Sequence, residues 1–166
     1  MAAGATYEPI ATQTLASAAA TITFSSIPST YTDLRLVIFS IGTSAGTQFI
    51  LFNSSVTGYS NTWLLGDGTS ASSGRSTSYP RLDLNSQNTA NATPQLNTVD
   101  IFSYAGSTNK TCLMTSSADR NGSGLTYSQV GLWQDTTAIN RIDIKLSSTN
   151  TYAIGTTATL YGIKAA

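Results

Sequence analysis

The sequence contains no histidine among its 166 residues and only one glutamate, Glu8. Because histidine is the usual general base near neutral pH and the commonest metal ligand, triad hydrolases and most zinc sites are excluded. A pair of catalytic carboxylates, as in glycoside hydrolases, would have to come from the aspartates, and most of these lie in predicted turns or at alternating strand positions. We therefore predict no catalytic, cofactor-binding or metal-binding residue and no enzymatic activity.

The sequence also has only one cysteine, Cys112, so an intramolecular disulfide is excluded. A catalytic thiol needs a partner base and a polar, partly exposed site, whereas Leu113 and Met114 follow Cys112 and predict a small buried residue. No run of about 18 apolar residues occurs, so no transmembrane helix is predicted. The N-terminus has neither the basic nor the apolar region of a signal peptide, and we expect synthesis in a cytoplasm.

Charge is scarce as well. Charged residues make up 10% of the chain and the formal net charge is +0, against about 25% charged residues in an ordinary soluble domain. The basic residues are scattered, so neither nucleic acid nor a membrane is a predicted partner. Lysine, which surface helices use often, occurs only at Lys110, Lys145 and Lys164. With a single glutamate besides, this composition predicts an all-β protein.

Hydrophobic residues reach 40% of the chain, which excludes a disordered polar tract. Short apolar or alternating runs, bounded by Gly, Ser, Asn or Pro, recur along the sequence. Their spacing predicts an antiparallel, jelly-roll-like β-sandwich of about 8 to 10 strands, formed by a single domain at residues 7–166. The eleven candidate segments for these strands are Tyr7–Ile10, Ala20–Phe24, Asp33–Gly42, Gln48–Phe52, Asn61–Leu65, Tyr79–Leu84, Thr98–Ser103, Lys110–Ser116, Tyr127–Trp133, Arg141–Leu146 and Thr157–Lys164.

For three of these strands, the sequence also predicts a position in the sheet, a pairing or the orientation of the side chains. The strand Asp33–Gly42 is apolar on both faces beyond its first residues, which predicts a central position in its sheet. The strand Thr157–Lys164 is followed by two alanines only, and we expect it to pair with an N-terminal or central strand. In the strand Arg141–Leu146 the side chains alternate. The predicted core-facing residues there are Ile142, Ile144 and Leu146, and the predicted solvent-facing residues are Arg141, Asp143 and Lys145.

Two polar stretches, Gly66–Pro80 and Asn85–Gln95, are predicted to be long loops, which in compact domains are often functional. The aromatic residues Tyr59, Trp63 and Tyr79 flank the first loop. Aromatic rings beside hydroxyl and amide groups are typical of a sugar-binding groove. The alternative interpretation, that the tryptophans are core aromatics on strands, is the one that the strand pattern favours.

Two shorter motifs have a similar ambiguity. The segment "ADRNGSG" at Ala118–Gly124 has the spacing of a calcium loop, but the downstream bidentate acid is missing, so a plain turn is predicted. The segment "GDG" at Gly66–Gly68 is predicted to be a turn for the same reason.

Four segments carry a resemblance to a known family: "YEPIATQTLASAAATITFSSIPSTYTDLRLVI" at Tyr7–Ile38, "LLGDGTSASSGRSTS" at Leu64–Ser78, "GLWQDTTAINRIDIKL" at Gly131–Leu146 and "LYGIK" at Leu160–Lys164. In this order they resemble virion proteins of tailed bacteriophages, of the cyanophage and marine-phage type. The resemblance covers nearly the whole chain. It implies a β-sandwich virion component without enzymatic activity. In this family, related modules occur both as small head proteins and as terminal parts of tail fibres.

We expect a stand-alone module, because no coiled coil, collagen-like repeat or β-helix repeat precedes it. This favours a capsid decoration (cement) protein that binds the outer surface of the phage head and bridges capsomers. The resemblance implies the major capsid protein and the chain itself, as a homotrimer, as partners. The small uncharged residues 1–6 are predicted to form a flexible capsid-contact arm, composed of Met1, Ala2, Ala3, Gly4, Ala5 and Thr6.

An alternative remains open. The chain could be a receptor-binding module of a tail fibre or tail tip that recognises host surface glycans. In that case the Gly66–Pro80 loop and the rings of Tyr59, Trp63 and Tyr79 would form the glycan-binding surface.

Overall fold

Every regular element that the structure describes is a β-strand. The computed structural model describes residues 6–43, 46–88, 93–119 and 121–164. Within these ranges there are twelve strands, more than the 8 to 10 expected. They are β1 (Tyr7–Thr14), β2 (Thr21–Ser25), β3 (Asp33–Ser40), β4 (Gly46–Phe52), β5 (Tyr59–Gly66), β6 (Ala71–Tyr79), β7 (Leu82–Asn88), β8 (Gln95–Phe102), β9 (Lys110–Asp119), β10 (Gly124–Trp133), β11 (Arg141–Leu146) and β12 (Thr157–Ile163).

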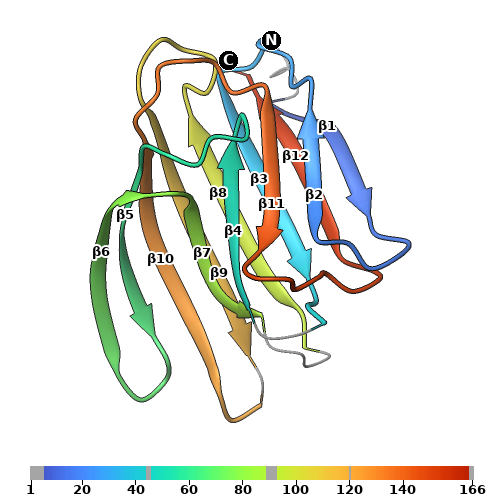
Figure 1. The fold of residues 1–166 in the computed structure, drawn as a ribbon, viewed down its shortest axis with the longest axis vertical. Helices are drawn as coiled ribbons and strands as arrows, with labels where there is room; N and C mark the ends of the chain where they lie inside the picture. The colour runs from blue at the N-terminus through green and yellow to red at the C-terminus, as the bar shows by residue number, and fades with distance from the viewer. Residues whose placement is uncertain (1–5, 44–45, 89–92, 120, 165–166) are drawn as a thin grey trace.

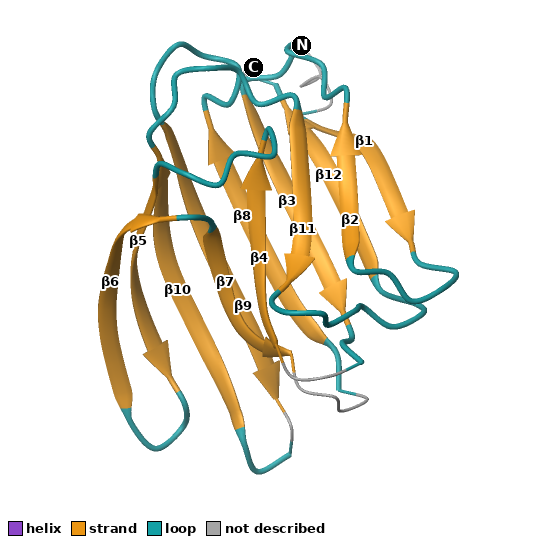
Figure 2. Ribbon diagram, in the orientation of Figure 1, coloured by secondary structure: helices purple, strands orange, loops and turns teal. Residues whose placement is uncertain are grey.

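The strands form two antiparallel sheets that pack face to face (Figures 1 and 2). The larger sheet has eight strands in the order β1-β12-β3-β8-β9-β10-β5-β6, and the smaller has four in the order β2-β11-β4-β7. The predicted antiparallel β-sandwich is therefore confirmed. Because the larger sheet is twice as wide, part of its inner face at the β5–β6 end extends beyond the small sheet (Figure 1).

The last strand, β12, is paired with a neighbouring strand on both sides. It pairs with β1 from Tyr7↔Ile163 to Thr14↔Thr157 and with β3 from Asp33↔Ile163 to Phe39↔Thr157. At the same end, the backbone N–H of Lys164 donates to the carbonyl of Thr6 at 3.0 Å. The prediction that this strand pairs with an N-terminal or central strand is confirmed, and it pairs with one of each.

The core lies between the sheets and follows the strand alternation. In β3, Leu34, Leu36 and Ile38 are completely buried, while the intervening residues face outward. Cys112 on β9 is also completely buried, and this burial raises the pKa of its thiol well above the ordinary value. The prediction of a small buried core residue at Cys112 is thus confirmed.

The prediction that Gly66–Pro80 forms one long loop is wrong. Apart from Pro80, the irregular part is the turn at Asp67–Ser70, where the Asp67 carboxylate accepts hydrogen bonds from the backbone N–H groups of Thr69 and Ser70. The rest forms the edge strand β6, which pairs with β5. The sequence of β6 lacks apolar alternation because it lies at the edge of the sheet and most of its side chains are exposed on both faces.

The prediction that Asp143 faces solvent is also wrong, since the residue is only 4% exposed. Its carboxylate accepts hydrogen bonds from Thr23 at 2.6 Å, from Ser54 at 3.0 Å and from both Nε and Nη2 of Arg141. Burial by itself raises the pKa of Asp143, but these hydrogen bonds outweigh it and hold the pKa below the ordinary value. Alternation along β11 could not reveal this, because Thr23 and Ser54 come from distant parts of the chain.

A pH dependence follows from Asp143. A carboxyl whose pKa is lower in the folded chain stabilises the fold above about pH 4, and this stabilisation is lost as the pH falls through the folded-state pKa. We expect Asp143→Asn to lower the free energy of unfolding at pH 7 by about 2 kcal/mol. In urea unfolding experiments, the difference from the wild type should shrink below about pH 4.

The matched control is Asp100→Asn, which removes a carboxylate from a more exposed ion pair with Arg35, 3.5 Å away. Such pairs contribute about 0 to 1 kcal/mol. A difference between Asp143→Asn and the wild type that stays constant from pH 7 down to about pH 3 would contradict the assigned role.

Candidate functional site

The outer faces of the two sheets differ in charge. The four-stranded sheet carries charged side chains along its outer face, where Arg81 pairs with Asp83 at 2.6 Å and the more exposed Arg141 covers the buried carboxylate of Asp143 at 2.8 Å. Lys145 on β11 adds a further charge to this face. Charges of both signs are typical of a surface that stays in contact with water.

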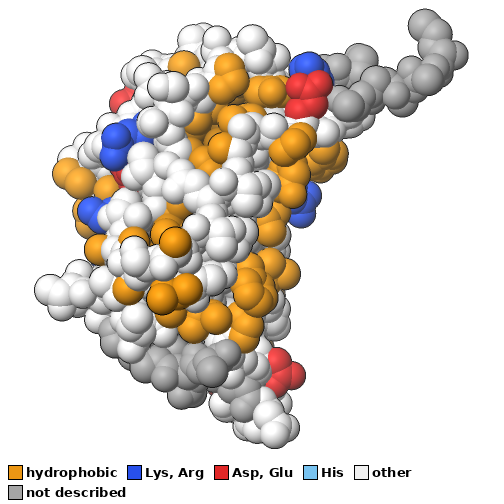
Figure 3. All heavy atoms as spheres, turned by 90° about the vertical axis from the view of Figure 1, so that its right-hand side faces the viewer, with side chains coloured by type: hydrophobic (Ala, Val, Ile, Leu, Met, Phe, Trp, Pro, Cys, Tyr) orange, Lys and Arg blue, Asp and Glu red, His pale blue; other side chains and the backbone are white. Residues whose placement is uncertain are grey.

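The outer face of the eight-stranded sheet is instead rich in exposed hydrophobic side chains. Among the described residues, seven of the nine large hydrophobic side chains that are exposed lie on this face. They are Tyr7, Phe39, Leu64, Leu96, Phe102, Leu113 and Val130. Figure 3 looks onto the β1 edge, so this face is seen in profile, and hydrophobic side chains extend down that side of the molecule with a few charged groups beside them. We call this outer face the docking face.

The centre of the docking face is nearly neutral. Leu113 on β9 stands between Val130 on β10 and Asp100 on β8, and Asp100 stands beside Arg35 on β3. Arg35 and Asp100 form an ion pair at 3.5 Å. Because these two charges neutralise each other, a partner could cover the face without having to supply a compensating charge.

Threonine and serine fill the positions between the hydrophobic side chains. Hydroxyl groups pair across neighbouring strands, as in Thr12 with Thr159 and Thr14 with Thr157, each at 3.1 Å. Such pairs already satisfy part of their hydrogen-bonding capacity within the sheet. The face therefore combines hydrophobic area with hydroxyl groups that cost less to cover than charged groups would.

The sequence contained one signal of this face. The apolar pattern of Asp33–Gly42 predicted a central strand, and β3 does lie inside its sheet, between β12 and β8. No second layer covers its outward side chains, however, and Phe39 is 46% exposed. An apolar pattern on both faces thus marked a strand with one face in the core and the other on the docking face.

The predicted arm lies almost wholly outside the described residues, since only Thr6 of residues 1–6 is described. Thr6 is exposed and its carbonyl is held by Lys164. The arm's contact with a capsid stays a prediction.

The three aromatic residues of the alternative glycan surface have different environments. Tyr59 is completely buried, its ring stacks on that of Trp133 at 6.0 Å, and burial raises its pKa to about 12. Trp63 is half-buried and stacks on Tyr127, and Tyr79 is half-buried beside the guanidinium of Arg81. Tyr59 has no exposed surface, so it cannot contact a glycan.

The two short motifs both form hairpin turns. Asp67 lies in the turn between β5 and β6. Asp119, the last residue of β9, accepts a hydrogen bond from the backbone N–H of Asn121, which precedes β10. A hollow of about 440 Å³ separates the two turns. In the ranges that the structure describes, no three His, Cys, Asp or Glu side chains are placed to hold a metal ion. The described residues also include no helix that is long and apolar enough to cross a membrane.

In comparisons with known proteins, no family model, no curated protein and no solved structure matches this chain. A function for the chain therefore has to be inferred from its sequence, its fold and the docking face.

Proposed function

We propose that the protein is a structural component of a tailed-bacteriophage virion, a capsid decoration (cement) protein that binds the outer surface of the head and bridges and stabilises capsomers. The observation that carries the proposal is the docking face, which is broad, nearly neutral at its centre and rich in exposed hydrophobic and hydroxyl side chains. The resemblance of four sequence segments to phage virion proteins supports the same function. No catalytic role is proposed.

The size of the docking face suits a protein partner. Eight strands about 4.8 Å apart, each with about eight residues at about 3.3 Å per residue, span roughly 900 Å². A stable protein interface buries about 800 Å² on each partner. The face could therefore support one interface of standard size, which we assign to the major capsid protein.

The fold supplies a rigid platform for this contact, because all eight strands of the sheet are joined by backbone hydrogen bonds and backed by the core. Each contact could be weak, since a symmetric shell repeats it many times and a protein that bridges capsomers gains from multivalency. Assembly of the chain as a homotrimer and ordering of the arm Met1–Thr6 on the head would add to this avidity, and both are part of the proposal.

A tail-fibre or tail-tip module is the competing function. The aromatic surface predicted for it is incomplete, because Tyr59 is buried. The amount of the protein in purified virions separates the two functions. A decoration protein should be present in a fixed ratio to the major capsid protein, which follows from the symmetry of the shell, whereas a tail-tip protein should be far scarcer.

Leu113→Lys tests the docking face. Leu113 is 47% exposed near the centre of the sheet and stands beside Asp100, so a lysine would find a carboxylate neighbour and the fold should tolerate it. Covering the new charge with a partner would be costly. We expect binding to capsids assembled without the protein, measured by co-sedimentation, to weaken at least about tenfold, equivalent to about 1.4 kcal/mol.

The control is Ile154→Lys, which makes the same change at a residue that is 66% exposed in the turn before β12 and outside the docking face. It should bind capsids as the wild type does. Equal binding by Leu113→Lys and the wild type would rule out the docking face as the capsid contact.

A further inference from the structure

A hollow lies at the β6 end of the eight-stranded sheet, on the same side as the docking face. Its volume is about 280 Å³, and it lies between β5, β6, β9 and β10. The hydroxyl side chains that line it are Ser60, Thr62, Thr77 and Thr111. Val130 and Leu132 add a hydrophobic part to the lining, and Arg75 adds the guanidinium of a cation.

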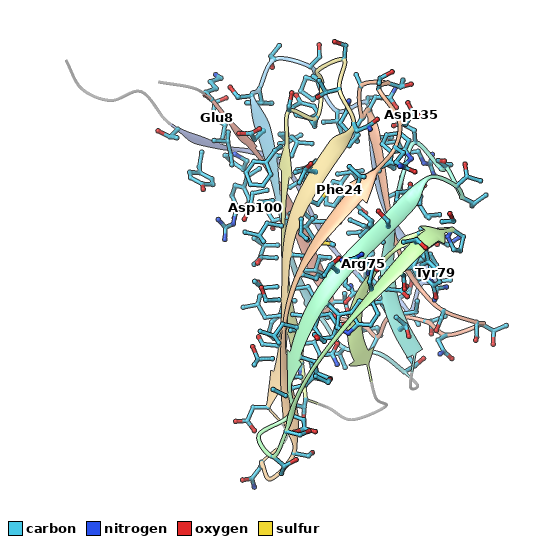
Figure 4. All side chains as sticks on the ribbon, turned by 90° about the vertical axis from the view of Figure 1, so that its left-hand side faces the viewer. Glu8, Phe24, Arg75, Tyr79, Asp100 and Asp135 are labelled. Carbon is cyan, nitrogen blue, oxygen red and sulfur yellow. The ribbon has the colours of Figure 1, made fainter. Side chains whose placement is uncertain are left out.

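Arg75 differs from the other arginines that the structure describes. Arg35, Arg81 and Arg141 each have an aspartate oxygen within 3.5 Å. Arg75 has no carboxylate within ion-pair distance among the described residues. Figure 4 shows it midway along β6, well separated from Asp100 and Asp135. The hollow therefore presents an arginine that is free to pair with an anion from outside.

The lining limits what this anion can be. A guanidinium binds a carboxylate through two parallel hydrogen bonds. A nucleic acid would require several cations to match successive phosphates, and Arg75 is the only basic residue in the lining. The hydroxyl groups match a ligand that itself carries hydroxyl groups, and the hydrophobic side chains match the C–H face of a ring.

We propose that this hollow binds a carboxylated sugar, such as a uronic acid unit of an acidic polysaccharide. Arg75 pairs with the carboxylate, Thr62 and its neighbouring hydroxyls bond to the sugar hydroxyls, and Leu132 with Val130 contacts the ring. The volume of about 280 Å³ lies just below the range of about 300 to 1,000 Å³ typical of small-molecule sites. It therefore suits a single sugar unit with the rest of the chain running outside.

This site lies at one end of the docking face and shares Val130 with it. Its lining reaches Thr111 on β9, but Arg75 on β6 lies four strands from β8, or about 19 Å at about 4.8 Å per strand. A protein held on a capsid through the centre of the docking face could thus keep the hollow at the rim of the contact. The site also differs from the surface around Tyr59, Trp63 and Tyr79, because the hollow includes none of these residues.

The test is an NMR titration of the full-length ¹⁵N-labelled protein with D-glucuronic acid. We expect amide shifts around the hollow, on β5, β6, β9 and β10. D-Glucose lacks the carboxylate and acetate lacks the ring, so each should bind at least about tenfold more weakly. Arg75→Ala should weaken glucuronate binding at least about tenfold, and Thr62→Val should weaken it by a smaller factor.

The control is Lys145→Ala, which removes a cation that also lacks a carboxylate partner among the described residues but lies on the other sheet. It should bind glucuronate as the wild type does. The proposal is overturned if glucuronate shifts no amide around the hollow, if Arg75→Ala binds it equally well, or if acetate or a glutamate-rich peptide binds more tightly. The titration uses the free protein without capsids, so failure of the capsid contact and failure of the sugar site can be told apart.

Discussion

Lys110→Met is expected to lower the free energy of unfolding by about 3 kcal/mol. Lys110 begins β9 and is completely buried. Its ammonium donates hydrogen bonds to the carbonyl oxygens of Gly106 at 2.6 Å, Thr108 at 2.5 Å and Thr136 at 3.4 Å. It thereby ties the loop before β9 to the loop after β10. Methionine fills similar space but cannot donate, so these carbonyls would lose their partner.

The matched control is Lys145→Met. Lys145 lies on a strand too, but it is half-buried and the structure gives it no ion-pair partner among the described residues. Its replacement should change the free energy of unfolding by less than about 0.5 kcal/mol. Urea unfolding followed by tryptophan fluorescence would measure both variants. Equal stability of the two would show that the buried ammonium is not a structural link.

The sequence was sufficient to predict most strands and the core. Period-two alternation is a local property, and in β11 it correctly placed Ile142, Ile144 and Leu146 in the core. The scarcity of Glu and Lys correctly indicated the absence of helices among the described residues. These predictions succeeded because each depends on neighbours in the sequence or on composition alone.

Features that depend on partners distant in the sequence could not be predicted. The burial of Asp143 depends on Thr23 and Ser54, which are 120 and 89 residues away. The edge strand β6 could not be recognised because a strand with little burial on either face shows no hydrophobic period. In both cases the missing information is which strands are neighbours, and strand order is not a local property.

The docking face and the hollow at Arg75 have the same origin. The docking face forms because the registers of β3, β8, β9 and β10 bring exposed hydrophobic residues onto one side. Arg75 lines the same hollow as Thr111 and Leu132 only because the sheet places β9, β10, β5 and β6 in succession. The sequence shows that a strand such as Asp33–Gly42 has apolar residues, including Phe39, on both of its faces. It does not show that such residues from different strands form one surface, because that depends on strand order.

Tyr59→Ala is expected to cause the largest loss of stability, about 4 kcal/mol. Tyr59 is completely buried, and its ring lies 6.0 Å from that of Trp133 and 6.2 Å from that of Phe52. Its hydroxyl accepts a hydrogen bond from the backbone N–H of Phe52 at 2.9 Å. Truncation would therefore leave a cavity within an aromatic cluster and a buried N–H group without its acceptor.

Two further variants separate these effects. Tyr59→Phe keeps the ring and removes only the hydroxyl, so it should lower the free energy of unfolding by about 1 to 2 kcal/mol. Tyr7→Ala truncates a tyrosine that is 49% exposed and should cost less than about 1 kcal/mol. If Tyr59 acted as a glycan contact, Tyr59→Ala would stay as stable as Tyr7→Ala and lose only glycan binding. If Tyr59→Ala is the least stable and Tyr59→Phe lies between it and the wild type, Tyr59 is a core residue. Any glycan recognition would then depend on groups at the surface, of which Arg75 is the first to test.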